Sequence, residues 1–207
     1  PDSALYNAQM HNTDSGQYES GSTANNTTGA YANSDMRTSN LAQATQKIVN
    51  DFGSSHVISY RDILPNATAD GKSSGWAWYD CKVELMSEVM VYGTKVWANS
   101  GYEVGCINSQ LPLFALAPEY IHRRFDYWLR GVESATNFAN VNNNGNANNN
   151  NASNSNGVRP ISSACLTMLY ADTGNEERRS CPCVCYIIRK KIKTMQFVTT
   201  DCYIGQI

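Results

Sequence analysis

Charged side chains are scarce in this chain of 207 residues, and long apolar runs are missing. Only 16% of the residues are charged and the net charge is −2, so no basic field would attract phosphate backbones, and we expect no nucleic-acid partner. No run of about 18 apolar residues occurs, so we expect no membrane insertion. The chain starts at Pro1 and not at methionine, so an upstream export signal or domain is not excluded and the compartment stays open.

Groups suited to catalysis are also few. His11, His56 and His122 are far apart in the sequence, and no hydrolase, zinc-protease, phosphate-loop or dinucleotide-binding motif occurs. Glu84 and Glu88 are four residues apart, and we interpret them as a solvated pair. The sequence therefore predicts no enzyme and no cofactor.

Seven cysteines form neither a clear disulfide framework nor a clear metal site. Two lie in the body of the chain and five near its end: Cys81 and Cys106, then Cys165, Cys181, Cys183, Cys185 and Cys202. Because the number is odd, reduced thiols and a partly oxidised set both remain open. The "CPCVC" stretch would place thiols on one side of an extended segment, but structural zinc sites usually separate paired cysteines by about two to four residues. We therefore expect no bound metal.

One helix has a strong sequence signal. The stretch "SNLAQATQKIVNDFG" predicts a helix over residues 41–52, because its apolar side recurs at helical spacing: Leu41, Ala44, Thr45, Ile48 and Phe52. Asn40 with Gln43 resembles a capping box at the start, and Gly53 stands where a left-handed cap would end the helix.

The rest of the body predicts short, irregular strands. "HVISYRDIL" fits a strand or the start of a second helix, and "KVELMSEVMVYG" fits a buried strand that breaks at Ser87 and Glu88. Trp76, Trp78 and Tyr79 form an aromatic cluster that we expect to pack against a partner. Short apolar runs separated by turn residues, at intervals of about 8–12 positions, predict an α+β domain with one or two helices and much loop.

Asparagine is the abundant residue. Between Asn137 and Asn156, twelve of twenty residues are asparagine, and by composition alone this segment is a flexible polar linker. However, Phe138, Val141 and Ala147 interrupt the asparagines, and asparagine tolerates left-handed backbone angles and can close its own turns. We therefore predict an ordered surface with Phe138 and Val141 turned inward and most asparagine side chains exposed.

Four stretches carry a resemblance to a known family: "GAYANSDMR", "LMSEVMVYG", "QLPLFALAPEYIHRRFDYWLRGV" and "NFANVNNNGNANNNNASNSNGVRP". Together they resemble the variable proteins of diversity-generating retroelements, in the C-type-lectin-like branch met in bacteriophage of gut bacteria. The most specific element is the pair "YWLR" and "GVRP" around the asparagine-rich segment. The resemblance implies a C-type-lectin-like fold, distantly related to the formylglycine-generating enzyme fold, and a display function.

The resemblance also implies a division of the chain. The variable domain spans residues 29–162, after a loop-rich extension over residues 1–28 and before a Cys-rich, basic extension over residues 163–207. From Gly174 onward the sequence departs from the family, whose members tend to end soon after "GVRP". The role of this last extension stays open.

The family supplies a reason for the asparagines. In these systems a reverse transcriptase randomises adenines, so adenine-rich asparagine codons become the positions that vary. The resemblance assigns a ligand-binding, variable role to Asn137, Asn140, Asn142, Asn143, Asn144, Asn146, Asn148, Asn149, Asn150, Asn151, Asn154 and Asn156. It places Arg123, Arg124 and Phe125 at the rim of the same face.

The remaining residues of this region are expected to form the scaffold. We expect Trp128 and Leu129 to anchor the frame, and Arg130 and Arg159 to be half-buried with their guanidinium groups on loop carbonyls. The scaffold positions within and after the segment are Phe138, Val141, Ala147, Gly157 and Val158.

The leading hypothesis is a display protein, on a phage virion or a bacterial cell surface, that binds a host-surface molecule or another protein. The alternatives are a structural or decoration protein of the virion and, with less support, an enzyme of the formylglycine-generating lineage. A homo-oligomer stays open. The fold name does not imply calcium-dependent sugar binding, because the asparagine-rich segment carries no carboxylates.

Overall fold

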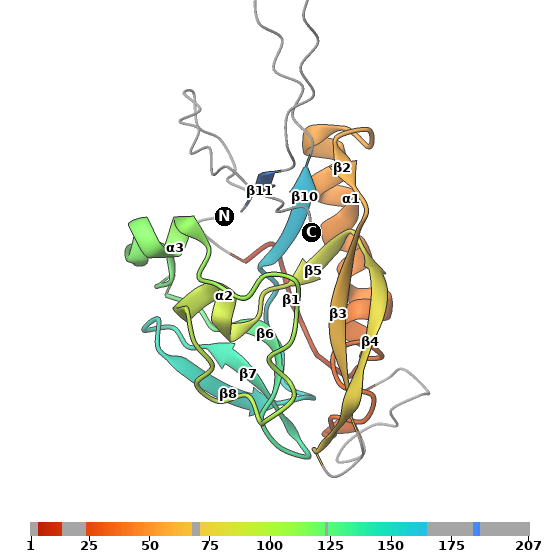
Figure 1. Ribbon diagram of the computed structural model, residues 1–207, viewed down its shortest axis with the longest axis vertical. Helices are drawn as coiled ribbons and strands as arrows, with labels where there is room; N and C mark the ends of the chain where they lie inside the picture. Colours follow the sequence, from red (N-terminus) through yellow and green to blue (C-terminus); the bar gives the residue numbers. More distant parts are fainter. Residues whose placement is uncertain (1–3, 14–23, 68–70, 123, 165–183, 187–207) are drawn as a thin grey trace, which may run out of the picture.

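The computed structural model describes residues 4–13, 24–67, 71–122, 124–164 and 184–186 (Figure 1). Short strands, few helical segments and much loop make up the described chain, so the predicted α+β class is confirmed. The strands are β1 (Asn7–Ala8), β2 (Val57–Ile58), β3 (Tyr60–Ala67), β4 (Ser73–Cys81), β5 (Val83–Leu85), β6 (Tyr127–Val132), β7 (Asn137–Val141), β8 (Ala147–Asn151), β9 (Asn156–Gly157), β10 (Pro160–Ala164) and β11 (Val184–Tyr186). The helical segments are η2 (Met36–Asn40), α1 (Leu41–Phe52), α2 (Glu88–Tyr92), α3 (Pro112–Leu116) and η3 (Pro118–Tyr120).

Within the described ranges the strands form three sheets. The largest has the order β1-β9-β6-β7-β8, and its pairs are antiparallel except for β6 with β9. In the second, β10 lies between β11 and β2, and β5 also pairs with β10. The third is the β3–β4 hairpin. Strands β6 and β7 are therefore interior strands, whereas β8 is an edge strand.

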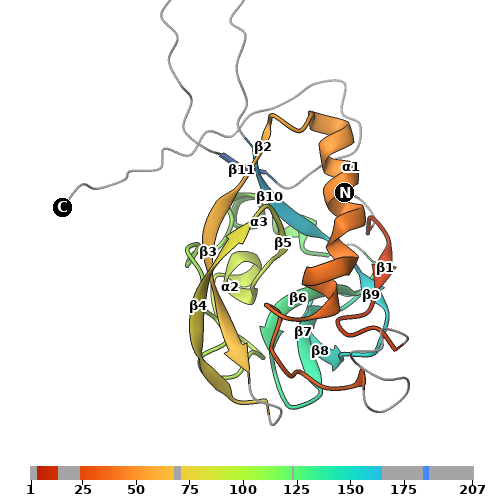
Figure 2. The ribbon, with the colours of Figure 1, turned by 90° about the vertical axis from the view of Figure 1, so that its right-hand side faces the viewer.

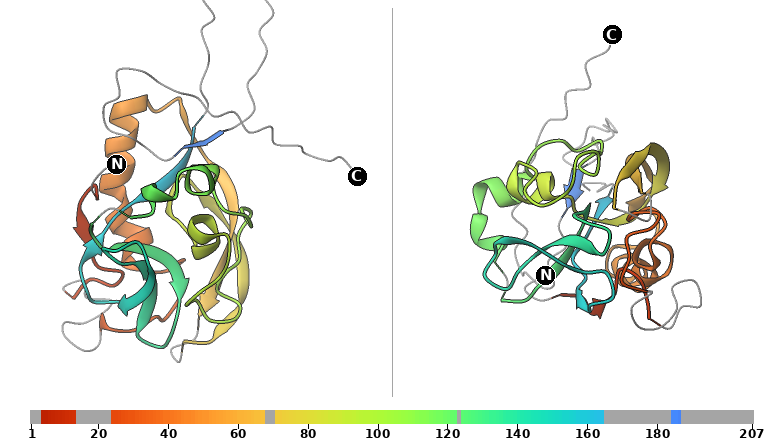
Figure 3. Two further views of the ribbon diagram at one scale, coloured as in Figure 1. Left: turned by 90° about the vertical axis from the view of Figure 1, so that its left-hand side faces the viewer. Right: turned by 90° about the horizontal axis from the view of Figure 1, so that it is seen from below.

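The five-stranded sheet contributes to two hydrophobic cores, because successive side chains of a strand point to opposite faces. One face packs in a core that includes α1, with Trp128, Phe138, Leu41 and Ile48 among its buried residues. The other face packs in a core that includes α2 and α3, with Leu129, Val141, Met90 and Phe114 among its buried residues. Figures 2 and 3 show α1 and the α2–α3 segment in different parts of the molecule around this sheet.

Helix α1 has the bounds predicted from the sequence. Leu41, Ala44 and Ile48 are buried on its inner face, as the periodicity predicts. Gly53 follows the helix with φ of 86°, and its N–H donates to the carbonyl of Val49 at 2.8 Å. The helix therefore ends at the residue where the glycine signal places its end.

The predicted capping box at Asn40 is wrong. Asn40 has helical backbone angles and its side chain makes no capping hydrogen bond, because the π-helical segment η2 leads directly into α1. Its side-chain amide donates instead to the carbonyl of Gln9 at 2.9 Å and to Oδ1 of Asn12 at 2.8 Å. Asn40 thus joins the segment after β1 to the start of the helix.

Two ambiguous stretches are resolved by the structure. Residues 57–67 form β2 and β3 and not a helix. Strand β5 ends before Ser87, as predicted, but the chain then forms the short helix α2. The Ser87 hydroxyl caps this helix by accepting the Met90 N–H at 3.2 Å.

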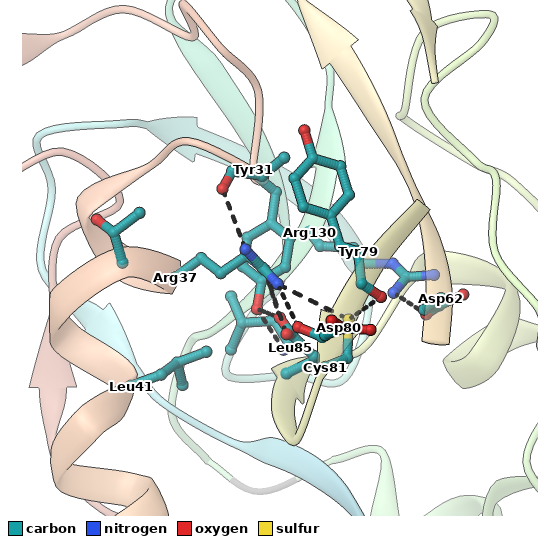
Figure 4. A network of polar contacts seen from close by, with 12 residues as sticks. Tyr31, Arg37, Leu41, Asp62, Tyr79, Asp80, Cys81, Leu85 and Arg130 are labelled. Atoms are coloured by element: carbon teal, nitrogen blue, oxygen red, sulfur yellow. Dashed lines mark hydrogen bonds and ion pairs between the residues drawn. The ribbon is translucent and has the colours of Figure 1, made fainter. Parts of the chain in front are cut away.

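The interpretation of Glu84 and Glu88 as a solvated pair is wrong, since both are buried. Glu84 pairs with Arg37 at 3.2 Å and accepts the Tyr31 hydroxyl at 2.5 Å, in the polar network that Figure 4 shows from close by. Glu88 accepts backbone N–H groups from the loop after α2. The two carboxylates serve different networks because β5 ends and α2 starts between them.

Arg130 and Arg159 are more deeply buried than predicted, with 0% and 1% of their surface exposed. Arg130 donates to Oδ2 of Asp62 at 2.8 Å (Figure 4). It also donates to the loop carbonyl of Val104 at 3.0 Å. The Arg159 guanidinium lies over the rings of Phe114 and Tyr127, 5.2 and 5.0 Å from their centres. Both cations are part of the core.

The expectation of a packed aromatic cluster fails for two of its three members. Trp76 and Trp78 are 56% and 47% exposed, whereas Tyr79 is half-buried. The two indoles meet edge to face with ring centres 6.5 Å apart. They point away from the core because they occupy alternate positions on the outer face of β4.

Some predictions concern residues outside the described part of the chain. These are Cys165, Cys181, Cys183, Cys202 and most of residues 163–207. In the described part, Cys81 is a buried free thiol and Cys106 an exposed one. Strand β1 belongs to the five-stranded sheet, and the domain boundaries after residues 28 and 162 stay predictions.

Candidate binding face on the asparagine-rich hairpin

The asparagine-rich segment forms a β-hairpin. Strands β7 and β8 pair in register from Asn137 opposite Asn151 to Val141 opposite Ala147. Phe138 and Val141 are fully buried, as predicted, and they enter the two different cores. The linker interpretation therefore does not describe this segment, because its apolar residues hold it to the domain on both faces.

The turn of the hairpin is closed by Asn142. Its side-chain Oδ1 accepts the backbone N–H groups of Asn144 and Asn146, each at 3.0 Å. Gly145 has φ of 84°, and a Cβ there would lie 3.0 Å from that of His122. The turn is therefore built by one asparagine side chain and by a glycine that lets the segment before β6 approach closely.

Two aromatic residues from another part of the chain donate hydrogen bonds to the backbone of the hairpin. The Tyr92 hydroxyl donates to the carbonyl of Gly145 at 3.0 Å, and the Trp97 indole N–H donates to the carbonyl of Ala147 at 3.0 Å. Burial raises the pKa of Tyr92, and Tyr127 and Glu88 raise it further, so the hydroxyl stays protonated and can donate. Neither residue could be predicted from the sequence, because no local pattern links them to the hairpin.

Trp97 is itself held by Glu88. The Glu88 carboxylate accepts the backbone N–H groups of Val96, Trp97 and Ala98, each at 2.9–3.0 Å. Glu88 is 0% exposed, and these three donors replace the water that its charge has lost. The Glu88 carboxylate, which from the sequence alone we interpret as solvated, thus holds the loop whose Trp97 binds β8.

Several asparagine amides bind one another. Asn137 donates to Asn149 across the hairpin at 2.7 Å, and Asn150 donates to Asn156 at 3.3 Å. Asn154 donates in turn to the Asn150 Oδ1 at 2.5 Å. These amides are partly committed to the frame of the segment.

Five asparagines keep side-chain amides that bind no other described residue. Four of them are exposed and Asn148 is half-buried: Asn143, Asn144, Asn146, Asn148 and Asn151. They lie at the tip of the hairpin and along β8. We call this set the free-amide face.

Two predicted variable positions do not face solvent. Asn140 is 0% exposed and Asn156 is 6% exposed, so the expectation of outward side chains is wrong for both. Asn140 lies on the interior strand β7 between Trp128 of β6 and Asn148 of β8. Within the described chain neither amide atom of Asn140 has a hydrogen-bond partner. The period of two along β7 puts Asn140 on the same inner face as Phe138.

The predicted rim residues are placed unevenly. Arg123 lies outside the described residues, whereas Arg124 is exposed with φ of 60°. Phe125 is half-buried, and its ring centre is 5.9 Å from that of Tyr127. His122, which directly precedes these rim residues, lies close to Gly145 and so beside the hairpin tip.

The hairpin carries no charged side chain of its own, so the polar side chains that it presents are neutral amides. In the described ranges no group of three His, Cys, Asp or Glu side chains is arranged to hold a metal ion. No helix described by the structure is long and apolar enough to cross a membrane.

Residues 19–163 match the family model named "Domain of unknown function (DUF6273)". The chain belongs to the DUF6273 family. The match contains α1 and the complete asparagine-rich hairpin, so the hairpin is part of the family domain. No curated protein and no solved structure matches the chain.

We expect Asn142 and Asn144 to respond differently to alanine. Asn142→Ala removes the acceptor of two turn N–H groups and should lower the free energy of unfolding by about 0.5–1.5 kcal/mol. Asn144→Ala removes an exposed amide and should change it by less than about 0.5 kcal/mol. Chemical denaturation followed by circular dichroism measures both values. Equal effects would mean that the Asn142 side chain does not close the turn.

Proposed function

We propose that this chain is a ligand-binding display protein of the diversity-generating-retroelement type, with a C-type-lectin-like fold. In this proposal the free-amide face recognises a host-surface molecule or another protein, on a phage virion or a bacterial surface. The observation that carries it is the division of one hairpin into apolar residues buried in two cores and asparagines whose amides remain free. The proposal assigns no catalytic activity.

The division suits a surface that must accept different side chains. A new side chain in a core costs roughly 1–3 kcal/mol through overpacking or burial of a polar group. A change at an exposed position usually costs less than about 0.5 kcal/mol. The exposed positions Asn143, Asn144, Asn146 and Asn151 can therefore vary without changing the frame that Phe138 holds.

The same face predicts weak binding by the sequence as it stands. Binding hot spots are usually Trp, Tyr or Arg, with amide groups contributing complementarity around them. Trp97, 42% exposed and bonded to the backbone of β8, is the aromatic residue at the edge of this hairpin. We expect tyrosines introduced around it to raise affinity, because tyrosine adds contact area at low entropic cost on a rigid scaffold.

A display library tests this proposal. The free-amide face is diversified with tyrosine, serine and asparagine and panned against bacterial surface extracts and purified proteins. The matched control library carries the same diversity on the outer face of α1, at Ala42, Gln43, Gln46, Lys47 and Asn50, which are exposed. We expect folded members of the hairpin library to be enriched and control members not to be. Equal enrichment would remove the recognition role.

A second test concerns the origin of the diversity. We expect the neighbouring DNA to encode a reverse transcriptase and to contain a near-identical repeat of the codons for residues 123–160. A locus that lacks both would leave a binding protein without this mechanism of variation.

The edge position of β8 favours one alternative, an assembly role in a virion. Natural edge strands are usually protected by charged residues or proline, and β8 (Ala147–Asn151) contains neither. Pairing of this edge with a strand of another chain would make the segment an assembly interface. The double variant Asn148→Lys with Asn150→Lys should abolish such assembly in sedimentation experiments. A wild-type protein that is already monomeric in the same experiment would contradict the alternative.

A further inference from the structure

A cavity of about 360 Å³ lies apart from the hairpin tip, beside the start of α2. Its wall is formed by the β3–β4 hairpin, by the first residues of α2 and by the loop over residues 103–108. Four of its lining side chains are apolar, Ile63, Val89, Val104 and Ile107, and Trp76 adds an indole. The volume and apolar lining are those of a small-ligand site.

One carboxyl group lines this cavity, that of Glu103. Its Oε2 accepts the N–H of Val89 at the long distance of 3.5 Å. Its Oε1 is buried beside Gly131, where an added Cβ would lie 2.6 Å away, and has no hydrogen-bond partner among the described residues. Glu103 is therefore a half-buried acid that is only partly satisfied, because one of its two oxygens lacks a partner in the described chain.

The charges around Glu103 do not balance it. Glu88 at the start of α2 is a second buried carboxylate, and Asp62 on β3 is a third. Arg130 on β6 is the buried cation of this group, and it pairs directly with Asp62. Burial and the nearby Glu88 raise the pKa of Glu103, and Arg130 with the backbone N–H groups of Val89 and Glu88 offsets only part of this, so the pKa lies at about 7. The carboxyl group of the cavity thus has no cation of its own, because Arg130 is paired with Asp62.

The cavity also has an aromatic wall that is open to solvent. Trp76 lines it and is 56% exposed, although its ring also meets that of Trp78 edge to face. Its neighbour Trp78 is equally outward but does not line the cavity, and its ring is already covered by the guanidinium of Arg61 at 5.5 Å. The indole of Trp76 is therefore available to a ligand in a way that Trp78 is not.

We propose that this cavity binds a small organic cation, of the alkylated-ammonium class, with Glu103 as its counter-charge and Trp76 as its aromatic wall. An indole attracts ammonium groups through its ring face, and a desolvated carboxylate supplies the opposite charge. The apolar side chains accommodate the alkyl groups. This site is independent of the free-amide face and of the display function.

Binding and protonation are coupled at such a site. A cation binds the ionised form of Glu103, so binding should release protons near pH 7 and become tighter as the pH rises. With a pKa of about 7, the ionised fraction rises about tenfold between pH 6 and pH 8, and the affinity should rise by a similar factor. A site that used only apolar contacts would show no such dependence.

The test is a titration of the full chain with tetramethylammonium chloride, followed by NMR at constant ionic strength. We expect a saturable shift of the Trp76 indole N–H signal. The neutral, similarly shaped tert-butanol should bind at least about tenfold more weakly, as expected when a buried charge has no partner. Equal shifts with both probes, or no saturable shift with tetramethylammonium, would overturn the proposal.

Matched variants separate the two contacts. Glu103→Gln should weaken binding at least about tenfold and remove the pH dependence. Trp76→Ala should weaken it by about twofold to thirtyfold, the range of an exposed to a desolvated cation–π contact, whereas Trp78→Ala should leave it unchanged. If Glu103→Gln does not fold, the pH profile of the wild type and the two tryptophan variants carry the same test. A flat pH profile, or equal effects of Trp76→Ala and Trp78→Ala, would overturn the proposal.

Discussion

Replacement of Trp128 by alanine is expected to lower the free energy of unfolding by about 3–5 kcal/mol. Trp128 is 0% exposed on the interior strand β6 and packs in the core that contains Phe138 and α1. Its indole N–H donates to the carbonyl of Ala8 at 2.8 Å, so the change also removes a link to β1. Urea denaturation followed by tryptophan-independent far-ultraviolet circular dichroism measures the loss.

The matched control is the double change of Asn148 and Asn149 to serine. Both side chains are half-buried on the edge strand β8, and we expect a loss of less than about 1 kcal/mol. Losses of equal size at Trp128 and at these asparagines would contradict the division of this region into a buried scaffold and an outer strand that tolerates substitution.

The second large effect is expected at the buried ion pair of Asp62 with Arg130. Asp62→Ala should lower the free energy of unfolding by about 3–5 kcal/mol, because it leaves a fully buried guanidinium without its counter-charge. It also removes the Oδ1 acceptor of two backbone N–H groups, those of Ile63 and Cys106, at 2.8 and 2.7 Å. Denaturant unfolding of the single variants gives the value for each partner.

A double variant tests whether Asp62 and Arg130 stabilise the fold through their interaction with each other. Asp62→Leu combined with Arg130→Met removes both charges, and we expect it to be more stable than Arg130→Met alone, in which Asp62 is left buried and unpaired. The single variants for comparison are Asp62→Leu and Arg130→Met. If the double variant lost as much free energy of unfolding as the sum of these two losses, the two side chains would not be energetically coupled.

The ion pair also predicts a response to acid. Burial alone would raise the pKa of Asp62, but the charge and hydrogen bonds of Arg130, with the N–H groups of Cys106 and Ile63, hold it below its usual value. Ionised Asp62 therefore stabilises the fold above the ordinary aspartate pKa, and this contribution is lost as the pH falls through the lower pKa of the folded state. Unfolding midpoints measured from neutral pH down to acid should fall less steeply for Asp62→Asn than for the wild type.

Helix α1 and the inward residues of the hairpin were predictable because their signals are local. The apolar spacing of Leu41, Ala44 and Ile48 is a property of one stretch of chain, and so is the alternation around Phe138 and Val141. Gly53 marks the end of the helix for the same reason.

The errors arose where the deciding partner is distant in the sequence. Glu84 is buried because Tyr31 and Arg37, 53 and 47 residues away, satisfy its charge. Asn140 looks like its neighbours in composition, and only the pairing of β7 between β6 and β8 shows that it points inward. Trp76 was expected to be covered because its size suggested burial, whereas its strand places it on an outer face.

The role of Asn142 in closing the turn, together with the burial of Asn140 and Asn156, limits how freely this segment can evolve. Any process that randomised all twelve asparagine codons alike would also strike these three, and many of its products would fold poorly whatever they bound. The number of variants that fold is therefore smaller than the twelve asparagine codons would imply. Under the proposed display function, selection for foldability would act on every variant before selection for a ligand could begin.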